Sequence, residues 1–226
     1  MNLIEHYNKL YYTSTNDIKK DKYVIDPLID SNADNRFGLT LLFRPDETIN
    51  NHIQAFLSDL RKIEPNQYYY PNSDIHVTVL SIISCYSEFN LDQISIDDYR
   101  YVIEESLMGC KSFDIDFRGI TASSSCIMIQ GFPSDHSLKK LRDRLRYNFK
   151  NSQLQQSIDT RYSINTSHST VARFRTPFTR KEDYLAVLEE YRNYFFGTLK
   201  VKTLEFVYND WYLRKGSVII LDAMLI

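Results

Sequence analysis

The segment spanning residues 113–118 alternates strictly between apolar and charged side chains. Phe113, Ile115 and Phe117 are each followed by a charged residue. Since successive side chains of a strand point to opposite faces, this segment can bury one face and expose the other. Strands with one solvated face are typical of antiparallel sheets. The alternation therefore favours an architecture built on antiparallel sheets, each with one face toward the core.

Strand-like and helix-like patterns alternate along the chain of 226 residues. Periodicity and capping residues predict helices at residues 1–20, 47–63, 95–109, 135–150 and 179–195, and strands at 37–43, 67–70, 75–83, 113–123, 125–132, 164–175, 198–208 and 217–225. Residues 21–36 and 151–162 are polar and irregular. This order predicts an α+β protein with an N-terminal helical extension over residues 1–36 and one compact unit of two similar lobes over residues 37–226. The extension could be a lid over the cleft or a brace against the first lobe.

The charge balance excludes some classes of protein. Lys and Arg number 27 against 29 Asp and Glu, a formal net charge of −2. A polycation of the histone or ribosomal type is excluded. Long duplex nucleic acid is not expected as a partner, because it usually needs a net basic face. A small anion held by a local basic cleft remains compatible with this balance.

Cysteine usage and hydropathy predict the compartment. The three cysteines Cys85, Cys110 and Cys126 are well spaced and form no CxxC or CxxH cluster, as expected in a reducing compartment. No run of about 18 apolar residues exists, so no membrane segment is expected. A cytoplasmic location is therefore predicted. The chain has only six glycines and no GxGxxG or GxxxxGKS/T motif, so a glycine-rich phosphate loop is not expected.

Two of the five histidines share a local pattern. His76 and His168 each begin a β-prone segment, and Thr78 and Thr170 follow them two residues later. The two His-x-Thr motifs lie about ninety residues apart, one in each predicted lobe. Side chains at positions i and i+2 of a strand share a face. Each histidine is therefore expected to project together with its threonine, away from the core.

Two such strands facing one groove would bring two imidazoles and two hydroxyls into one small volume. An imidazole titrates near pH ~6.5, so one ring can be neutral while the other is protonated. A general base and a general acid need these two states. Threonine hydroxyls can donate hydrogen bonds to non-bridging phosphoryl oxygens, where charge develops in the transition state. A single histidine on a strand is more often structural, but the matched pair favours acid–base chemistry at a phosphate.

A metal site is not predicted. No third His, Cys or carboxylate stands at ligand spacing beside either motif. No cofactor is expected either. Asp74, two residues before His76, could orient the imidazole or remain solvated.

The sequences HVTV at residues 76–79 and HSTV at residues 168–171 resemble the two signature motifs of the 2H phosphoesterase superfamily. This superfamily includes LigT-like RNA 2′,5′-ligases and phosphodiesterases and 2′,3′-cyclic nucleotide phosphodiesterases. The second motif is also similar to the HxTxxRF form of LigT-like members, through Arg173 and Phe174. The resemblance spans roughly residues 37–225. It implies a bilobal α+β fold in which two antiparallel sheets flank a central, metal-independent cleft and helices lie outside.

The resemblance implies roles for five residues. His76 and His168 would be the acid–base pair, and Thr78 and Thr170 would bind the phosphate. Arg173 would add charge near the cleft, but at i+5 from His168 it faces the opposite side of an ideal strand. It needs a bulge or bend to reach the phosphate, and is otherwise a structural ion-pair partner. The run LSIISCYSEF after the first motif lacks the Phe-Leu-Gly continuation of close LigT relatives, so their substrate does not transfer.

The sequence therefore predicts a metal-independent phosphoesterase that hydrolyses a 2′,3′-cyclic phosphate or a 2′,5′-phosphodiester of a nucleotide or RNA end, with 2′,5′-ligation as a further activity. Two alternatives stay open: a non-catalytic module that binds a nucleotide or RNA, and an enzyme that acts on sugars or sugar phosphates with the same histidine pair. The basic helix at residues 135–150 could meet RNA phosphates but is more often a solvated face. Several aromatic residues could stack a base, although packing is their more common role: Tyr68, Tyr69, Tyr70, Tyr208, Trp211 and Tyr212.

Overall fold

The computed structural model of the chain describes residues 2–161 and 163–226. Its helices are α1 (Leu3–Lys19), α2 (Glu47–Ile63), α3 (Ile96–Leu107), α4 (Ser137–Ser152) and α5 (Lys181–Glu190), with short 3₁₀ turns η1 (Leu91–Gln93) and η2 (Lys215–Ser217). Its strands are β1 (Arg36–Phe43), β2 (Tyr68–Tyr69), β3 (Val77–Ser87), β4 (Phe113–Ala122), β5 (Cys126–Pro133), β6 (Ser169–Arg173), β7 (Phe195–Val201), β8 (Thr203–Asp210) and β9 (Ile219–Leu225). Residue 1 of the predicted helix 1–20 and residue 162 of the predicted loop 151–162 lie outside the described residues.

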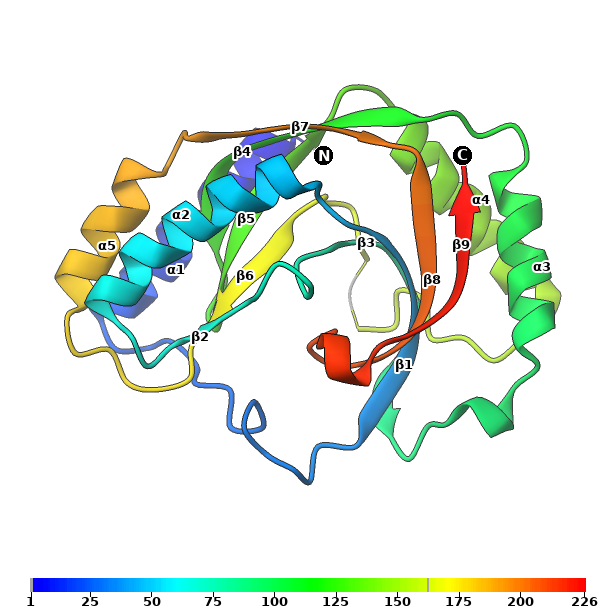
Figure 1. Cartoon of the computed structure of the whole chain (residues 1–226), viewed down its shortest axis with the longest axis horizontal. Coiled ribbons are helices and arrows are strands. Elements are labelled where there is room, and N and C mark those ends of the chain that lie inside the picture. The colour runs from blue at the N-terminus through cyan, green and yellow to red at the C-terminus, as the bar shows by residue number, and fades with distance from the viewer. Residues whose placement is uncertain (1, 162) are drawn as a thin grey trace.

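The strands form two antiparallel sheets, which confirms the predicted α+β architecture. One sheet has four strands in the order β3-β1-β8-β9, and the other has five in the order β2-β6-β5-β4-β7. The helices lie outside the sheets, with α1, α2 and α5 gathered at one side and α3 and α4 at the other (Figure 1). α1 and α2 contact β4 and β7 of the five-stranded sheet, whereas α3 and α4 contact β9 and β3 of the four-stranded sheet.

Each sheet takes strands from distant parts of the chain. The short strand β2 lies early in the sequence but pairs with β6 in the five-stranded sheet, and the last strands, β8 and β9, join β1 in the four-stranded sheet. The two lobes are therefore interleaved in sequence. The first His-x-Thr motif leads into β3 and the second into β6, so the motifs still belong to different sheets.

The prediction of one strand over residues 198–208 is wrong. β7 ends at Val201 and β8 begins at Thr203, and the two strands belong to different sheets. β7 pairs with β4, whereas β8 pairs with β1 and β9. The residues on both sides of Lys202 are strand-forming and no glycine or proline marks the break. Only the pairing partners, which lie far away in the sequence, divide this segment into two strands.

Helix α2 shows how local sequence produces these elements. The Asp46 side chain accepts a hydrogen bond of 2.9 Å from the Ile49 amide and so caps one of the free N–H groups of the first turn. The apolar stripe predicted for this helix is buried, and it comprises Ile49, Ile53, Phe56, Leu57 and Leu60. Burial of such a side chain contributes roughly 1.5–3 kcal/mol, so this face holds α2 against β7.

Strand β3 departs from regular alternation along its pairing with β1. The register shifts in three places; for example, the partners of the neighbouring residues Leu41 and Leu42 lie two residues apart in β3. Each extra residue is a bulge that changes which face the following side chains occupy. The partly exposed positions of β3 consequently recur every third residue, at Thr78, Ser81 and Ser84.

Gly38 in β1 lies where β3 bends around its neighbour. An added Cβ at Gly38 would lie 2.3 Å from the carbonyl oxygen of Ile83 and 2.9 Å from the amide nitrogen of Cys85. Both atoms belong to the backbone, which cannot move aside without breaking the strand pairing. We expect Gly38→Ala to lower the free energy of unfolding in urea by about 1–3 kcal/mol. Gly216→Ala is the control, since its Cβ would meet no atom within 4 Å, and equal stability of the two variants would contradict this account.

Candidate active site

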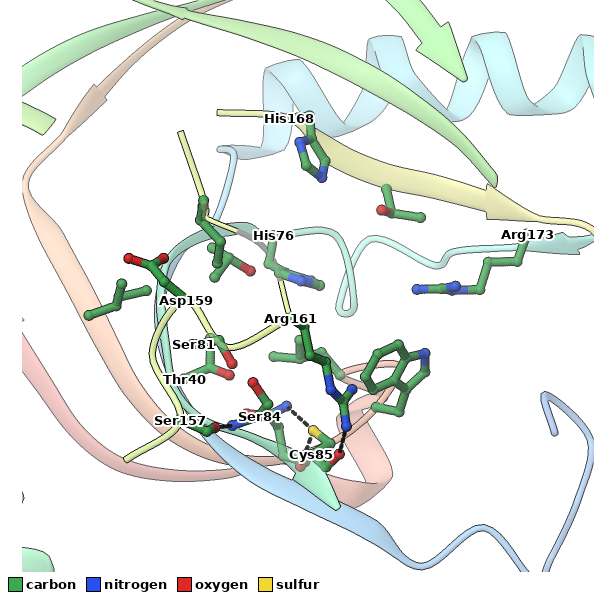
Figure 2. Close-up of a pocket in the computed structure, with 17 residues that line it drawn as sticks. Thr40, His76, Ser81, Ser84, Cys85, Ser157, Asp159, Arg161, His168 and Arg173 are labelled. Atoms are coloured by element: carbon green, nitrogen blue, oxygen red, sulfur yellow. Dashed lines mark hydrogen bonds between the residues drawn. The ribbon is translucent and has the colours of Figure 1, made fainter. Parts of the chain in front are cut away.

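A cavity of about 150 Å³ lies between the two sheets. Its walls come from β1, β3 and the end of β8 in the four-stranded sheet, from β6 in the five-stranded sheet, and from the loop that precedes β6. Figure 2 shows His76 and His168 in this cavity, with Arg173 beyond them. All five residues singled out in the sequence line it: His76, Thr78, His168, Thr170 and Arg173.

His76 stands immediately before β3, and the backbone orients its ring. Nδ1 lies 2.7 Å from the carbonyl oxygen of Asp74. Because a carbonyl can only accept, Nδ1 carries a proton and Nε2 is the nitrogen left for the cavity. The carboxylate of Asp74 accepts hydrogen bonds from the Ser73 hydroxyl and the Lys215 amide, at 2.7 and 3.0 Å. Asp74 thus orients the imidazole through its carbonyl, one of the two roles that the sequence left open.

His168 stands in the corresponding place before β6. Its Nδ1 lies 2.8 Å from the hydroxyl of Thr166, which again leaves Nε2 for the cavity. The amide of the neighbouring Ser167 donates to the Tyr7 hydroxyl at 3.2 Å, and that hydroxyl donates to the Gly131 carbonyl at 3.3 Å. Tyr7 belongs to α1, which packs on β4. The N-terminal helix therefore contacts the sheet that carries His168, beside the histidine itself.

A bulge in β6 gives Arg173 access to the cavity. Two adjacent residues of β5 pair with Ala172 and Thr170, which lie two residues apart, so Val171 is the extra residue. A bulge of this kind changes the face of the residues that follow it. Arg173 consequently lines the same cavity as Thr170. This irregularity is the one that the sequence analysis required for Arg173 to reach the cleft.

Arg173 is also held by the protein around it. Its Nε donates a hydrogen bond of 2.9 Å to the Tyr70 hydroxyl, and its Nη1 lies 3.7 Å from a carboxylate oxygen of Asp26. The guanidinium carbon lies 5.3 Å from the centre of the Tyr212 ring. Arg173 therefore combines the two roles considered for it, because it forms a structural ion pair and faces the cavity.

Arg142 is a residue of this site that the sequence analysis missed. It lies in α4, is only 4% exposed, and donates hydrogen bonds to three backbone carbonyls. Its Nε donates to Val79 at 2.8 Å, and its Nη2 donates to Thr78 at 2.8 Å and to Thr166 at 2.9 Å. One guanidinium thus ties the first motif to the segment before the second. Its position four residues after Leu138, on the apolar face of the helix, was the available signal.

The six aromatic residues considered for base stacking differ in whether they line the cavity. Of the six, only Trp211 lines the cavity. Its ring lies within 4.7 Å of the Arg36 guanidinium carbon and 5.0 Å of that of Arg161. Tyr70 and Tyr212 are buried, and their hydroxyls bond to Arg173 and Asp26, as the packing interpretation held.

The cavity extends well beyond the histidines. Thr40, Ser81, Ser84 and Ser157 lie together, away from His168 and Arg173 (Figure 2). Together with Asn209 they make up a region that we call the far end of the cavity: Thr40, Ser81, Ser84, Ser157 and Asn209. The sequence analysis did not identify this region, although a hydroxyl residue at every third position from Thr78 was visible in it.

Burial is the main electrostatic influence on both imidazoles. It lowers the pKa of His76 to about 4, and the nearby charge of Arg44 acts in the same direction. Burial likewise lowers the pKa of His168 to about 4, with the charge of Arg142 as the next cause. Both rings are therefore neutral at pH 7 in the free protein, whereas acid–base chemistry needs one of them to be protonated. An anion in the cavity would raise both pKa values by attraction.

No cluster of three His, Cys, Asp or Glu side chains that could hold a metal ion occurs within residues 2–161 and 163–226. In the same part of the chain, no helix has the length and apolar character needed to cross a membrane.

Comparison with known proteins gives matches in structure but none in sequence. No family model matches the chain, and no curated protein does. TT0787 of Thermus thermophilus is similar with a TM-score of 0.57 at 15% identity, over 84% of this chain and 97% of that one. E. coli LigT in complex with 3′-AMP has a TM-score of 0.56 at 11% identity, over 84% and 98%. The MHV ns2 PDE domain has a TM-score of 0.50 at 12% identity, over 77% and 98%.

The chain has the 2H phosphoesterase fold. The architecture implied by the two His-x-Thr motifs is therefore confirmed. In this 2H phosphoesterase fold the two motifs lead into strands of different sheets, and both open onto one cavity.

Because both imidazoles in this 2H phosphoesterase fold are buried and neutral, we expect the folded state to lose stability at acidic pH. Each histidine has a pKa near ~6.5 when unfolded and about 4 when folded. The unfolded chain therefore binds more protons below pH ~6.5, so this stability is present above that pH and is lost as the pH falls toward 4. We expect the free energy of unfolding to drop between pH 7 and pH 5 by on the order of 1–2 kcal/mol for each ring.

Chemical denaturation across this pH range measures the effect. The double variant His76→Asn/His168→Asn removes the two titrating rings and should lose most of the decrease. An unchanged decrease in the double variant would show that other groups cause it.

Proposed function

We propose that this protein is a metal-independent phosphoesterase that hydrolyses a 2′,3′-cyclic phosphate or a 2′,5′-phosphodiester of a nucleotide or RNA end. The observation that carries the proposal is the convergence of two imidazoles and two threonines on one cavity. Each imidazole has its Nδ1 engaged by the protein, which leaves Nε2 for a substrate. The similarity in fold to LigT in complex with 3′-AMP and to the MHV ns2 PDE domain supports a nucleotide phosphodiester as the substrate class.

The reaction needs one histidine on each side of the phosphorus. One neutral imidazole takes a proton from water as the water oxygen attacks the phosphorus. The bond between the phosphorus and a ribose oxygen breaks, and the other, protonated imidazole gives its proton to that oxygen. In the ligation direction a ribose hydroxyl replaces water as the nucleophile. In the hydrolysis of a 2′,3′-cyclic phosphate, the product keeps its phosphate on the other ribose oxygen. Proton exchange with solvent then restores the starting protonation states of both imidazoles.

The threonines and Arg173 are proposed to bind the phosphate. The hydroxyls of Thr78 and Thr170 can donate to the non-bridging oxygens, which gain charge in the transition state. Arg173 adds positive charge at the same cavity. An anionic substrate raises the pKa of the nearby imidazoles, so binding itself supplies the protonated ring that the free protein lacks at pH 7.

Loss of either histidine is expected to abolish most of the activity. His76→Ala and His168→Ala should each lower kcat for 2′,3′-cyclic nucleotides about 10²- to 10⁴-fold, since each removes a proton-transfer group. Hydrolysis by the wild-type protein should persist in EDTA. His136→Ala is the matched control, because His136 is exposed at the start of α4 and lies outside the cavity.

Full activity in both single variants would contradict the proposal. Tight binding of nucleotides without turnover would identify a binding module instead. Turnover of sugar phosphates but not of cyclic nucleotides would identify an enzyme of another class with the same histidine pair.

The pH dependence should differ between kcat/KM and kcat. The profile of kcat/KM reports the groups of the free protein, whose pKa values of about 4 place its bell-shaped optimum on the acidic side. Above this optimum, kcat/KM should fall as the pH rises, because the general acid loses its proton. The optimum of kcat should lie at higher pH, because the bound anion raises both pKa values. Steady-state kinetics from pH 4 to pH 9 tests this, and a shared optimum for both parameters would contradict it.

A further inference from the structure

His168 stands just outside the regular strand pairing of its sheet. Strand β6 begins at Ser169, and the pair at that end of the β5–β6 ladder is Ile129 with Ser169. The ladder therefore fixes Thr170 and Arg173 but ends one residue before the histidine. A group that transfers protons must stay close to its working geometry, because a small displacement lowers the rate strongly. The segment that carries His168 consequently needs another support.

Helix α1 supplies this support through the hydroxyl of Tyr7. Two residues beyond the last pair, the register of the ladder places Gly131 opposite Ser167. The Tyr7 hydroxyl bridges these two residues, since it accepts from the Ser167 amide at 3.2 Å and donates to the Gly131 carbonyl at 3.3 Å. A side chain of the N-terminal helix thus continues the connection between β5 and the residues that precede β6.

The position of Tyr7 is fixed by contacts that do not involve His168. Its side chain is fully buried, and its ring meets the ring of Phe132 in β5 edge-on, with the ring centres 5.4 Å apart. The Thr121 hydroxyl in β4 donates to the Tyr7 carbonyl at 2.9 Å. Two strands of the sheet therefore hold Tyr7, and its hydroxyl is a fixed point to which the segment before β6 can bond.

Ser167 is closely packed and depends on this bond. An added Cβ at Gly131 would lie 2.0 Å from the Ser167 carbonyl oxygen, so the backbones of the two residues are in direct contact. Ser167 is only 1% exposed, and water does not replace the Tyr7 hydroxyl unless the segment moves. A buried amide without an acceptor is costly. Without the hydroxyl we expect the segment to shift, and His168 to shift with it.

We propose that Tyr7 is a positioning residue that holds His168 in place for proton transfer. Tyr7 lies outside the cavity and acts through Ser167, so it does not touch the substrate. The N-terminal extension is thereby a working part of the active site, as a brace behind the second histidine motif. The inference rests on the proposed function for the role of His168 as a proton-transfer group.

Kinetics of two matched variants test the positioning role. Tyr7→Phe should lower kcat for a 2′,3′-cyclic nucleotide about tenfold and leave KM within about twofold, because the proposed phosphate-binding residues keep their places in the strands. Tyr11→Phe is the control and should change neither value. Tyr11 lies one turn further along α1, is likewise buried, and donates to Glu189 at 2.7 Å, outside the cavity. Thr121→Val, which removes the bond to the Tyr7 carbonyl, should act like Tyr7→Phe to a smaller extent, and replaces it if that variant does not fold.

A measurement without substrate separates this inference from the proposed function. The pKa of the His168 ring is followed by NMR in the free protein, and the signals that are missing in His168→Asn identify this ring. Tyr7→Phe should raise the pKa toward ~6.5, because a displaced segment admits water to the ring. Tyr11→Phe should leave the pKa unchanged. The titratable groups that interact with this ring are the same in both variants: Arg142 of α4, His6 of α1 and His76 before β3.

The two measurements have distinct outcomes. Equal losses of kcat in Tyr7→Phe and Tyr11→Phe would show that Tyr7 only stabilises the helix and would overturn the inference. An unchanged His168 pKa in Tyr7→Phe would also overturn it. If the wild-type protein hydrolyses no cyclic nucleotide, the proposed function fails, and the NMR comparison still decides whether Tyr7 holds His168 in place.

Discussion

The guanidinium of Arg142 joins the two halves of the cleft. Its three hydrogen bonds go to backbone carbonyls, two beside the first histidine motif and one beside the second. A buried charge is costly unless its donors are satisfied, and burial lowers the pKa of Arg142 to about 10. The carbonyls satisfy these donors only when β3 and the segment before β6 lie in their native positions. The relative position of the two histidines and the burial of this charge therefore depend on one another.

The same charge shapes the chemistry of the cavity. The positive field of Arg142 acts with burial to hold the pKa of His168 low, and Arg44 has this role toward His76. The free site thus combines neutral imidazoles with fixed cationic side chains nearby. Such a site attracts an anion, and the anion then favours protonation of one ring. Two arginines, Arg161 and Arg173, line the cleft although the whole chain carries a formal charge of −2.

Local irregularities of the strands decide what the cavity contains. The bulge at Val171 turns Arg173 toward the cavity, and the bulges of β3 place three hydroxyl residues on one side of that strand. A regular alternation would have sent about half of these side chains into the core. Sequence periodicity assumes that regular alternation, which explains why the histidines and threonines of the cavity were predicted and its far end was not. Arg142 was missed for a related reason, since a charged residue within a basic helix is usually assigned to the solvent face.

The sequence by itself determined the elements with strong periodicity and the pair of His-x-Thr motifs. The apolar stripe of α2 and the hairpin of β4 and β5 were predicted because local spacing alone produces them. The tertiary structure alone decided that residues 195–210 form two strands of different sheets, that α1 packs beside His168, and that Asn209 lines the cavity. These features depend on hydrogen bonds between residues far apart in the chain, and no local pattern carries information about such partners.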